Sequence, residues 1–400
     1  MNPEFIQSPE DLQSLCESLG KESLIAFDTE FIAEDSYRPQ LCLLQVATRN
    51  HLAVVDPFVV GALDAFWKVL LDPEKMIIVH AGREESLFCI RATQQTIPNL
   101  FDIQVAAAML GYEYPASYGN LVQRFVGRQL NKEETRSDWR QRPLTHRQLD
   151  YAAQDVRDLP DIFDRLTQEL VKRDRLTWLE EDTARRQAEL LEGERNEQWH
   201  RLPGIQGLSG HHLAIAKRLW NWRETQAVER DIPPRRVLRD DLLIELAKRG
   251  SSDVKRIANL RGMNYRHVKS YLDELSECIE LGAKDPVPNW PKKIRYGHRH
   301  PSGMLTQFLG AALAFICRTK EIAPSIVGTS EDIRDFVLYR LESSARNLPP
   351  PALLQGWRKS VIGDQFDDLL HGKIGLALAN PLDDMPLRFC KTDTMDSSGS

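Results

Sequence analysis

The chain has 400 residues and a mass of 45.8 kDa, which is enough for two or three domains with separate cores. Hydrophobic residues make up 42% and charged residues 28% of it, as in ordinary globular proteins, and no apolar stretch approaches the roughly 20 residues of a membrane helix. The net charge of −6 would disfavour nucleic-acid binding if it were spread evenly over the chain.

The cysteines and the N-terminus indicate a cytoplasmic protein. The six cysteines are far apart and form no Cys-x-x-Cys pair, which argues against a zinc site and against a disulfide framework. The first residues contain no basic segment followed by an apolar run, so we expect no secretory signal.

Hydrophobic periodicity predicts strands first and then strands that alternate with helices. Strands are expected near residues 23–28, 41–47, 51–55, 76–79 and 99–102. Helices are expected near residues 61–71, 83–92, 103–110, 118–126 and 146–170. Three successive strands followed by strand–helix alternation predict an α/β fold, in which helices flank a mixed sheet.

The most informative segment is the apolar run from Ser23 to Phe31, because it contains two acidic residues, Asp28 and Glu30. Side chains alternate between the faces of a strand, so we expect both carboxylates on one face and Thr29 on the other. Two carboxylates beside an apolar core repel each other and lose hydration, and a strand tolerates them best with a cation between them. The alternative is a strand end whose acids face water.

A second acidic segment follows the β-type run at residues 76–79. His80 ends this run, Gly82 breaks it, and a helical pattern follows. Glu84 and Glu85 then fall in the first helical turn, where the helix dipole favours negative charge. The segment alone therefore also fits an ordinary helix start.

The third segment is the helix expected from residue 146. Thr145 is a natural N-cap, and Gln148 three residues later completes a capping-box pattern. Tyr151 and Asp155 are four residues apart, so they share one face of this helix. Such pairs arise by chance in many helices, and this pair gains meaning only from the other two segments.

In this order the three segments resemble the exonuclease motifs of the DEDDy class, and most closely those of bacterial ribonuclease D. They are an Asp-x-Glu strand at Asp28 and Glu30, a His-Ala-Gly turn followed by an acid at Glu85, and a Tyr-x-x-x-Asp helix at Tyr151 and Asp155. The resemblance implies a ribonuclease-H-like exonuclease domain.

The resemblance continues between the motifs, in residues 37–47, 100–107 and 131–139, and spans about residues 28–158. One position departs from the family, which has Asp where this chain has Glu85. The charge and the oxygen ligands remain, but the side chain is one methylene longer. This difference affects the expected rate and metal preference more than the class of reaction.

The family implies a site with two divalent metal ions, Mg²⁺ or Mn²⁺, and no organic cofactor. Four carboxylates without His or Cys suit these ions better than zinc. Asp28 is best placed on its strand to bridge the ions; by resemblance, Glu30 and Asp155 hold the ion that binds the attacking water, and Glu85 the ion at the leaving 3′-oxygen. The resemblance also implies that Tyr151 positions this water through its hydroxyl. A phenol with an ordinary pKa near ~10 is a poor base at neutral pH, so the metal must do most of the deprotonation.

Four neighbouring residues stay outside the predicted catalytic set. His80 is not assigned as a general base, because the motif gives the water-orienting role to Tyr151. Trp139, Arg140 and Arg142 either stack on and grip the substrate strand or serve as a core tryptophan and solvated arginines. Both interpretations stay open at this point.

The charge of the chain is divided unevenly. Residues 195–300 contain 21 Lys and Arg against 13 Asp and Glu, a balance of +8, which leaves −14 for the remainder. Residues 219–224, 231–238 and 242–247 resemble an HRDC domain, a small helical nucleic-acid-binding module found in helicases and ribonuclease D. A basic module beside an acidic catalytic body suits an enzyme that takes its phosphate affinity from the module, although uneven charge between domains is common.

These patterns predict four parts. A DEDDy exonuclease domain is expected at residues 1–190, an HRDC domain at 205–285, a second HRDC-like helical domain at 300–382 and a disordered tail at 385–400. The glycines at 204, 207 and 210 lack the G-x-G spacing and the preceding strand of a dinucleotide-binding turn, so no nucleotide cofactor is expected there.

The favoured function is a 3′–5′ exoribonuclease that removes one nucleotide at a time. The resemblance implies RNA as partner, with 3′ ends of precursor tRNA or other structured RNA as substrate, and no membrane or obligatory oligomer. A first alternative is DNA as substrate, since DEDDy domains also proofread DNA and a sequence does not reveal the groups that read a 2′-hydroxyl. A second is a non-catalytic RNA-binding scaffold, which the departure at Glu85 motivates.

Overall fold

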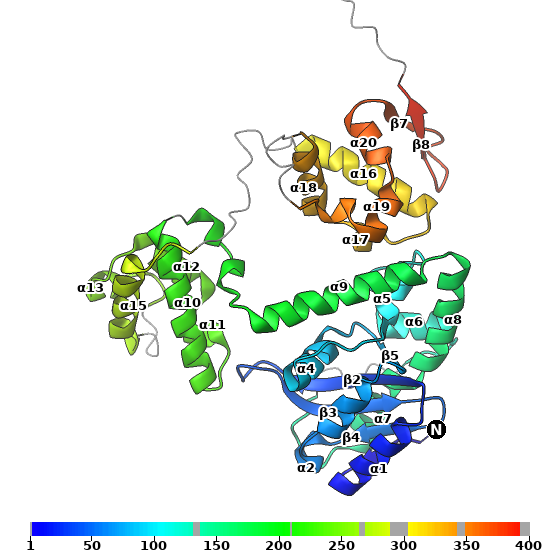
Figure 1. Cartoon of the computed structure of the whole chain (residues 1–400), viewed down its shortest axis with the longest axis horizontal. Helices are drawn as coiled ribbons and strands as arrows, with labels where there is room; N and C mark the ends of the chain where they lie inside the picture. The colour runs from blue at the N-terminus through cyan, green and yellow to red at the C-terminus, as the bar shows by residue number, and fades with distance from the viewer. Residues whose placement is uncertain are drawn as a thin grey trace, which may run out of the picture.

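The computed structural model describes residues 2–130, 137–208, 210–263, 269–288, 303–341 and 349–392. Its elements form three regions, which we call the sheet region (residues 2–195), the middle region (199–288) and the C-terminal region (303–392) (Figure 1). Within the described ranges, none of the helices combines the length and the apolar character that crossing a bilayer requires.

A six-stranded mixed sheet forms the centre of the sheet region, with the strand order β1-β4-β3-β2-β5-β6. The strands are β1 (Glu4–Ile6), β2 (Leu24–Ile32), β3 (Gln40–Ala47), β4 (Leu52–Val55), β5 (Met76–Val79) and β6 (Leu100–Asp102). β2, β3 and β4 form an antiparallel meander, whereas β2 and β5 run parallel. The carboxyl ends of β2 and β5 therefore lie at the same edge of the sheet, and the predicted α/β fold with a mixed sheet is confirmed.

Helices cover both faces of this sheet. One face packs against α1 (Pro9–Leu19), α2 (Pro57–Val60), α3 (Asp64–Leu70) and α4 (Arg83–Thr93). The other packs against α5 (Ile103–Ala108), α6 (Tyr118–Phe125), α7 (His146–Arg157) and α8 (Leu159–Lys172). Along β2 the side chains alternate between the two cores, with Ile25 and Phe27 in the first and Leu24 and Ala26 in the second.

Two helix predictions in this region are wrong in detail. Residues 146–170 form two helices, α7 and α8, with a break at Asp158. Pro160 has no N–H to donate to the carbonyl of Val156, and its ring would clash with that carbonyl, so α7 cannot continue. The helix expected at residues 61–71 begins at Asp64, after the separate α2.

The middle region has a hydrophobic core of its own, which includes Leu219, Leu243 and Leu275. The helix α9 (Leu176–Arg195) leads into it from the sheet region (Figure 1). Its elements are η1 (Trp199–Arg201), η2 (Ile205–Gly207), α10 (His211–Glu229), α11 (Pro234–Val237), α12 (Asp240–Arg249), α13 (Val254–Ala258) and α15 (Leu272–Lys284).

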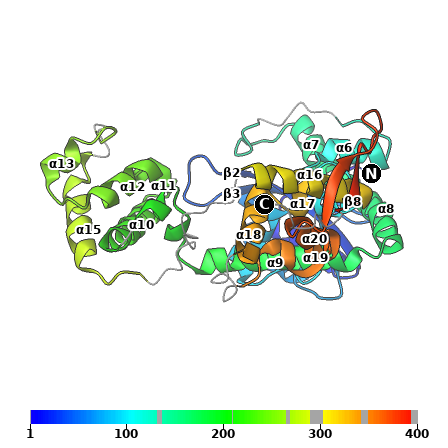
Figure 2. The same cartoon turned by 90° about the horizontal axis from the view of Figure 1, so that it is seen from above.

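Polar contacts join the middle region to the loop between β2 and β3, which reaches toward it in Figures 1 and 2. The backbone N–H of Tyr37 donates to the carboxylate of Asp231 at 3.0 Å. Arg236 binds Asp35 at 2.9 Å, and Asp35 also binds Arg140, in the loop before α7, at 3.3 Å. We call these residues the interdomain clasp; it is polar and mostly exposed, unlike the cores on either side.

The C-terminal region is helical only in its first part. It contains α16 (Gly303–Thr319), α17 (Pro324–Val327), α18 (Ser330–Leu341), η4 (Ala352–Leu354), α19 (Gly356–Ile362), α20 (Gln365–Leu370), β7 (Ile374–Leu378) and β8 (Leu387–Lys391). The last two pair as an antiparallel hairpin. An entirely helical segment at 300–382 and a disordered tail from 385 are therefore wrong, because Leu376 and Phe389 of the hairpin pack against a hydrophobic core. Residues 393–400 of the expected tail lie outside the described residues.

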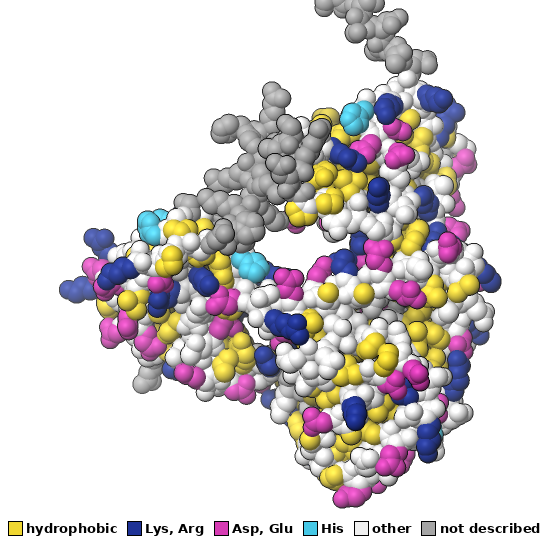
Figure 3. All heavy atoms as spheres, viewed as in Figure 1, with side chains coloured by type: hydrophobic (Ala, Val, Ile, Leu, Met, Phe, Trp, Pro, Cys, Tyr) yellow, Lys and Arg dark blue, Asp and Glu magenta, His cyan; other side chains and the backbone are white. Residues whose placement is uncertain are grey.

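The C-terminal and sheet regions share one hydrophobic core. This core joins Ile162 and Leu179 of the sheet region with Leu309, Phe336 and Trp357 of the C-terminal region. Figure 2 shows the C-terminal region lying over the sheet region, with the middle region to one side. In Figure 3 a gap separates the middle and C-terminal regions above α9.

A buried ion cluster reinforces the shared core. The fully buried carboxylate of Asp182 on α9 accepts hydrogen bonds from Arg186 at 2.6 Å and Arg185 at 3.0 Å, and pairs with Arg358 of α19 at 2.9 Å. Burial acts to raise the pKa of Asp182, but the charges of Arg186, Arg358 and Arg185 outweigh it and lower the pKa to about 2. The indole Nε1 of Trp357 donates to the same carboxylate at 3.4 Å.

Replacing Trp357 by Ala should destabilise both regions together. The indole is buried and stacks on Trp178 of α9 with ring centroids 5.8 Å apart, so its loss should lower the free energy of unfolding by about 3–5 kcal/mol. Hydrogen exchange should rise in α9 as well as in α19. The control is Trp222→Ala in the middle region, which should raise exchange there and leave α9 protected. Unchanged protection of α9 in the Trp357 variant would contradict a shared core.

Candidate active site

Asp28 and Glu30 lie on β2, near its carboxyl end. Antiparallel pairing places Asp28 opposite Gln45 and Glu30 opposite Leu43, so both acids lie on the sheet face that α7 covers, as the alternation predicts. Thr29 is buried on the other face. The pairing shifts only after Glu30 and leaves the register of the two acids regular.

A tight turn after β5 directs Glu85 toward β2. The backbone N–H groups of Ala81 and Gly82 donate to the carboxylate of Asp102 at 3.0 and 3.1 Å. A Cβ on Gly82 would lie 2.2 Å from a methyl carbon of Val79, so only glycine fits this close approach. The turn starts α4 at the carboxyl edge of the sheet, with Glu85 in its first turn.

The buried carboxylate of Glu85 accepts a 2.6 Å hydrogen bond from the Thr29 hydroxyl. A hydroxyl–carboxylate bond of this length is strong and holds Glu85 against the strand that also contains Asp28 and Glu30. Thr29 lies on the opposite face of the strand from Asp28 and Glu30, and Glu85 is 56 residues away in the sequence. No local sequence pattern therefore indicates this contact.

α7 supplies the remaining predicted residues. Its N-terminus has the predicted capping box, in which the Thr145 hydroxyl accepts from the N–H of Gln148 at 3.2 Å and the Gln148 side chain accepts from the N–H of Thr145 at 3.0 Å. Tyr151 and Asp155 follow one turn apart on the helix. Asp155 lies near enough to Asp28 for its charge to raise the pKa of Asp28.

The segment before α7 is held by a buried ion pair. Arg142 binds the fully buried carboxylate of Asp56 at 2.5 and 2.8 Å and donates to the carbonyls of Trp139 and Cys42 at 2.8 and 3.0 Å. Trp139 is 4% exposed, and its ring lies 6.1 Å from that of Tyr151, centroid to centroid. Of the two interpretations left open, the structure therefore favours a core tryptophan and, for Arg142, a structural pair.

Burial raises the pKa of all four carboxyl groups, and the charges of the other acids raise it further for Asp28 and Glu30. Burial raises the pKa of Glu30 to about 8, with further contributions from the charges of Asp155 and Glu85. Burial also raises the pKa of Glu85 and of Asp155 to about 7. The pKa of Asp28 is raised well above its ordinary value by burial and by the charges of Glu85, Asp155 and Glu30. We call these four residues the acidic cluster.

The donor set of the acidic cluster fits a divalent metal ion. No described Lys, Arg or His offsets the charge of these carboxylates, and an all-oxygen set of this kind suits Mg²⁺ or Mn²⁺. As they are placed, no three acidic, histidine or cysteine side chains in the described ranges converge closely enough to hold an ion. Joint ligation by these carboxylates therefore requires their side chains to move closer together, while the Thr29 bond occupies only Oε1 of Glu85.

His80 and Tyr118 hold the segments around the acidic cluster in place. His80 donates from Nε2 to the carbonyl of Ala116 at 3.0 Å, and burial lowers its pKa, so Nε2 is occupied by a structural hydrogen bond. The Tyr118 ring lies 5.5 Å from that of His80, and its hydroxyl donates to the carbonyl of Gln154 at 3.1 Å. Tyr118 thereby ties α6 to the turn of α7 that contains Asp155. Sequence reasoning missed Tyr118, because its partner is 36 residues away.

Gln45 is a second residue that sequence reasoning missed. It is fully buried directly opposite Asp28, and neither its amide nitrogen nor its amide oxygen has a partner among the described residues. An unpaired buried polar group costs about 1–3 kcal/mol, so its amide is a ready partner for the adjacent acidic cluster. The available signal was a polar residue inside the apolar run at 41–47.

Comparison with known families identifies the class of protein. The family model for a 3′–5′ exonuclease domain matches residues 3–171, and that for an HRDC domain matches residues 212–279. The chain is therefore a 3′–5′ exonuclease with an HRDC module, which agrees with the sheet region and the middle region described above.

Full-length relatives narrow this class to one family. Ribonuclease D of Gluconacetobacter diazotrophicus is 33% identical over 94% of this chain and 95% of its own length, and that of Granulibacter bethesdensis 31% over 94% and 95%. The crystal structure of Escherichia coli RNase D matches with a TM-score of 0.80 and 25% identity over 93% of this chain and 99% of its own. The crystal structure of the catalytic core of Trypanosoma brucei RRP6 matches with a TM-score of 0.53 and 26% sequence identity, over 70% of this chain and 79% of its own. The chain belongs to the ribonuclease D family and is an exoribonuclease.

Asp28→Asn should stabilise the protein in the presence of a chelator. Because Glu30 and Asp155 titrate at about 8 and 7 instead of 4.5 and 3.8, the folded protein binds more protons than the unfolded chain between about pH 4 and 8, and its stability falls as pH rises through this window. Asn removes the burial and repulsion penalty of Asp28. The melting temperature should rise above pH 8 by a few degrees, since about 1 kcal/mol corresponds to roughly 2–4 °C, and the gain should vanish below pH 4.

The matched control is Asp56→Asn, another buried aspartate, whose partner is Arg142. This change removes one member of a buried ion pair and should destabilise the protein by about 3 kcal/mol. Equal destabilisation by both substitutions would show that Asp28 has a structural partner after all.

Proposed function

We propose that the acidic cluster is the catalytic centre, and that the chain trims 3′ ends of precursor tRNA or other structured RNA with two divalent metal ions, Mg²⁺ or Mn²⁺. The observation that supports this most is the group of four neighbouring carboxylates, with Glu85 buried and the other three partly buried, whose pKa values are raised and which have no basic partner among the described residues. RNase D of Escherichia coli is described as an exoribonuclease involved in structured RNA processing, and we extend that substrate class to this chain.

The catalytic roles follow from the positions of the side chains. Metal ions held by the acidic cluster would activate a bound water and neutralise charge on the phosphate. The Tyr151 hydroxyl orients the attacking water, one turn from Asp155. Trp139 packs against the Tyr151 ring, and the Arg142–Asp56 pair holds Trp139, so the hydroxyl is confined before substrate binds.

The regions divide the work between chemistry and affinity. We assign RNA affinity to the middle region, because residues 195–300 have a balance of +8 while the rest of the chain has −14. All residues of the acidic cluster come from one chain, so an oligomer is not required. All six cysteines are free thiols, which suits a reducing cytoplasm.

The decisive test uses matched RNA and DNA hairpins with the same unpaired 3′ tail. The wild-type protein should shorten the RNA in steps of one nucleotide in Mg²⁺ or Mn²⁺, and chelation should stop it. Tyr151→Phe should lower kcat by roughly 10²–10⁴ while leaving RNA binding unchanged, because it removes only the group that orients water. A ladder from DNA alone would favour the DNA exonuclease. Binding of RNA without any ladder would favour the non-catalytic scaffold.

Glu85 should make the enzyme prefer Mn²⁺. Its longer side chain places the carboxylate about one C–C bond away from the family's position, and Mg²⁺ tolerates such displacement poorly because it demands near-ideal octahedral geometry. Glu85→Asp should narrow the preference, and Glu85→Gln should impair turnover with both metals. Turnover and the metal-induced rise in melting temperature should be measured for all three proteins. Wild-type rates from the Gln variant would exclude Glu85 from the site.

A further inference from the structure

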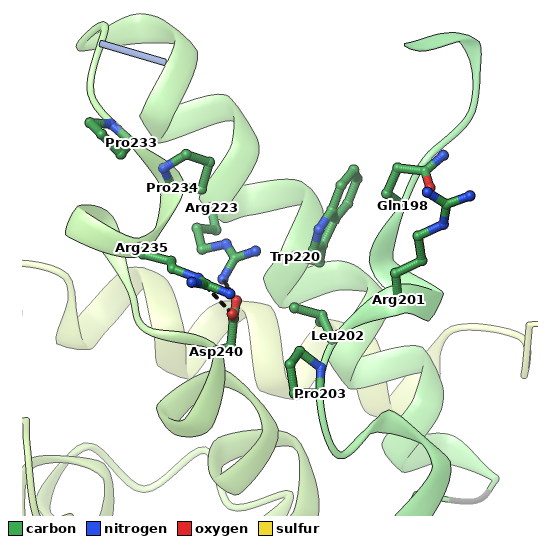
Figure 4. Close-up of a pocket in the computed structure, with 10 residues that line it drawn as sticks. All are labelled: Gln198, Arg201, Leu202, Pro203, Trp220, Arg223, Pro233, Pro234, Arg235 and Asp240. Carbon is green, nitrogen blue, oxygen red and sulfur yellow. Dashed lines mark hydrogen bonds and ion pairs between the residues drawn. The ribbon is translucent and has the colours of Figure 1, made fainter. Parts of the chain in front are cut away.

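We propose that a pocket in the middle region binds one unpaired nucleotide of the RNA substrate. A pocket of about 350 Å³ opens there between the connector after α9 and the turn from α10 to α11 (Figure 4). The inference rests on the proposed function in one respect, namely that RNA is the substrate. We call this site the nucleotide pocket.

The shape of the pocket suits a flat ring. Figure 4 shows the Trp220 indole in its middle, with Gln198 and Arg201 on one side and Arg235 and Asp240 on the other. Trp220 is partly exposed, and a leucine and three prolines complete the apolar lining. A volume of about 350 Å³ is at the lower end of ligand pockets, which range from about 300 to 1,000 Å³, so it suits one nucleotide rather than a larger ligand.

The charge of the pocket suits a phosphate. Asp240 is the only acidic residue in the lining, and it accepts hydrogen bonds from Arg223 at 2.7 Å and from Arg235 at 2.8 Å. Its charge is therefore already neutralised, and because Arg223 also pairs with Glu224 at 3.5 Å, the surplus positive charge lies on Arg201 and Arg235. Arg201 and Arg235 are exposed at the rim, where they can meet a phosphate on either side of a base.

An aromatic face between guanidinium groups distinguishes a nucleotide from a simple anion. Bases stack on aromatic side chains in a manner that tolerates any sequence, and arginines add charge and cation–π contacts. The base must be unpaired, because a base inside a duplex already has both faces covered. The pocket therefore selects the single-stranded part of an RNA that has a structured body.

The location of the pocket connects it to the catalytic centre. The α10–α11 turn that forms one of its walls also contains Asp231, and Arg236 follows in α11; both belong to the interdomain clasp. Through Asp35 the clasp reaches Arg140 in the loop before α7. A nucleotide held in the pocket is thus fixed relative to the two segments that flank the acidic cluster, the β2–β3 loop and the loop before α7.

The test measures RNA binding by the full-length chain in a chelator, so that no hydrolysis occurs. The probes are a fluorescent RNA hairpin with an unpaired 3′ tail and the same hairpin with a blunt end. Trp220→Leu should weaken binding of the tailed RNA roughly tenfold and leave the blunt hairpin unchanged, because a base–aromatic stack is lost. Trp220→Phe keeps an aromatic face and should restore most of the affinity.

A charge variant tests the pocket independently of the indole. The double substitution Arg201→Ala and Arg235→Ala should weaken tailed RNA and reduce the slope of log affinity against log salt by roughly 1.4, for two lost phosphate contacts. The matched control, Lys68→Ala with Arg165→Ala, removes two exposed charges from the sheet region and should leave both quantities unchanged. If Trp220→Leu does not fold, the arginine variant decides the question.

The outcomes separate this inference from the proposed function. Wild-type affinity for tailed RNA in both the Trp220 and the arginine variants would overturn the nucleotide pocket, as would equal losses for tailed and blunt hairpins. Turnover of the tailed RNA is measured separately, with metal. If no ladder forms but the tail preference still depends on Trp220, the proposed function fails and the nucleotide pocket stands. If a ladder forms but the tail preference does not depend on Trp220, the proposed function stands and the nucleotide pocket is overturned.

Discussion

The crowding of four carboxyl groups, shielded from water at one edge of the sheet, is the constraint on which the rest of this structure depends. β2 supplies two of them, while α4 and α7 supply one each, and no described basic residue neutralises them. Such a group stays together only if the surrounding scaffold is rigid. Three contacts provide that rigidity in the segments around the acids. They are the turn held by Asp102, the α7 capping box and the Arg142–Asp56 pair. These contacts therefore offset the unfavourable free energy of crowding the four acids at one site.

Local patterns were sufficient to locate the acids but not their supports. Alternation along β2 put Asp28 and Glu30 on one face, and the Thr145 capping box set the start of α7, because both depend on residues a few positions apart. The Thr29–Glu85 bond and the Tyr118 contact join residues 56 and 36 positions apart. No period in the sequence reports such contacts, since they exist only after the sheet and its helices have packed.

The same distinction explains the errors in the fold. Most strands and helices of the sheet region were predictable from their apolar period, and the mixed sheet followed from their order. The break at Asp158 depends on a single residue, Pro160, which interrupts an otherwise continuous helical period. The hairpin at 374–391 was missed because each strand has five residues and its apolar side chains pack against a core built largely from distant segments. The resemblance to ribonuclease D covered the motifs and only loosely the C-terminal region.

The shared core also has a consequence for synthesis of the chain. The part of this core in the sheet region ends at Leu179, and the part in the C-terminal region extends to Leu369, about 190 residues later. At roughly 5–20 residues per second, a ribosome needs about 10–40 s to cover that distance. The middle region, with its separate core, can fold in the interval. During this interval the apolar surface of the nascent sheet region stays exposed. Such a surface favours aggregation and is the kind that chaperones bind.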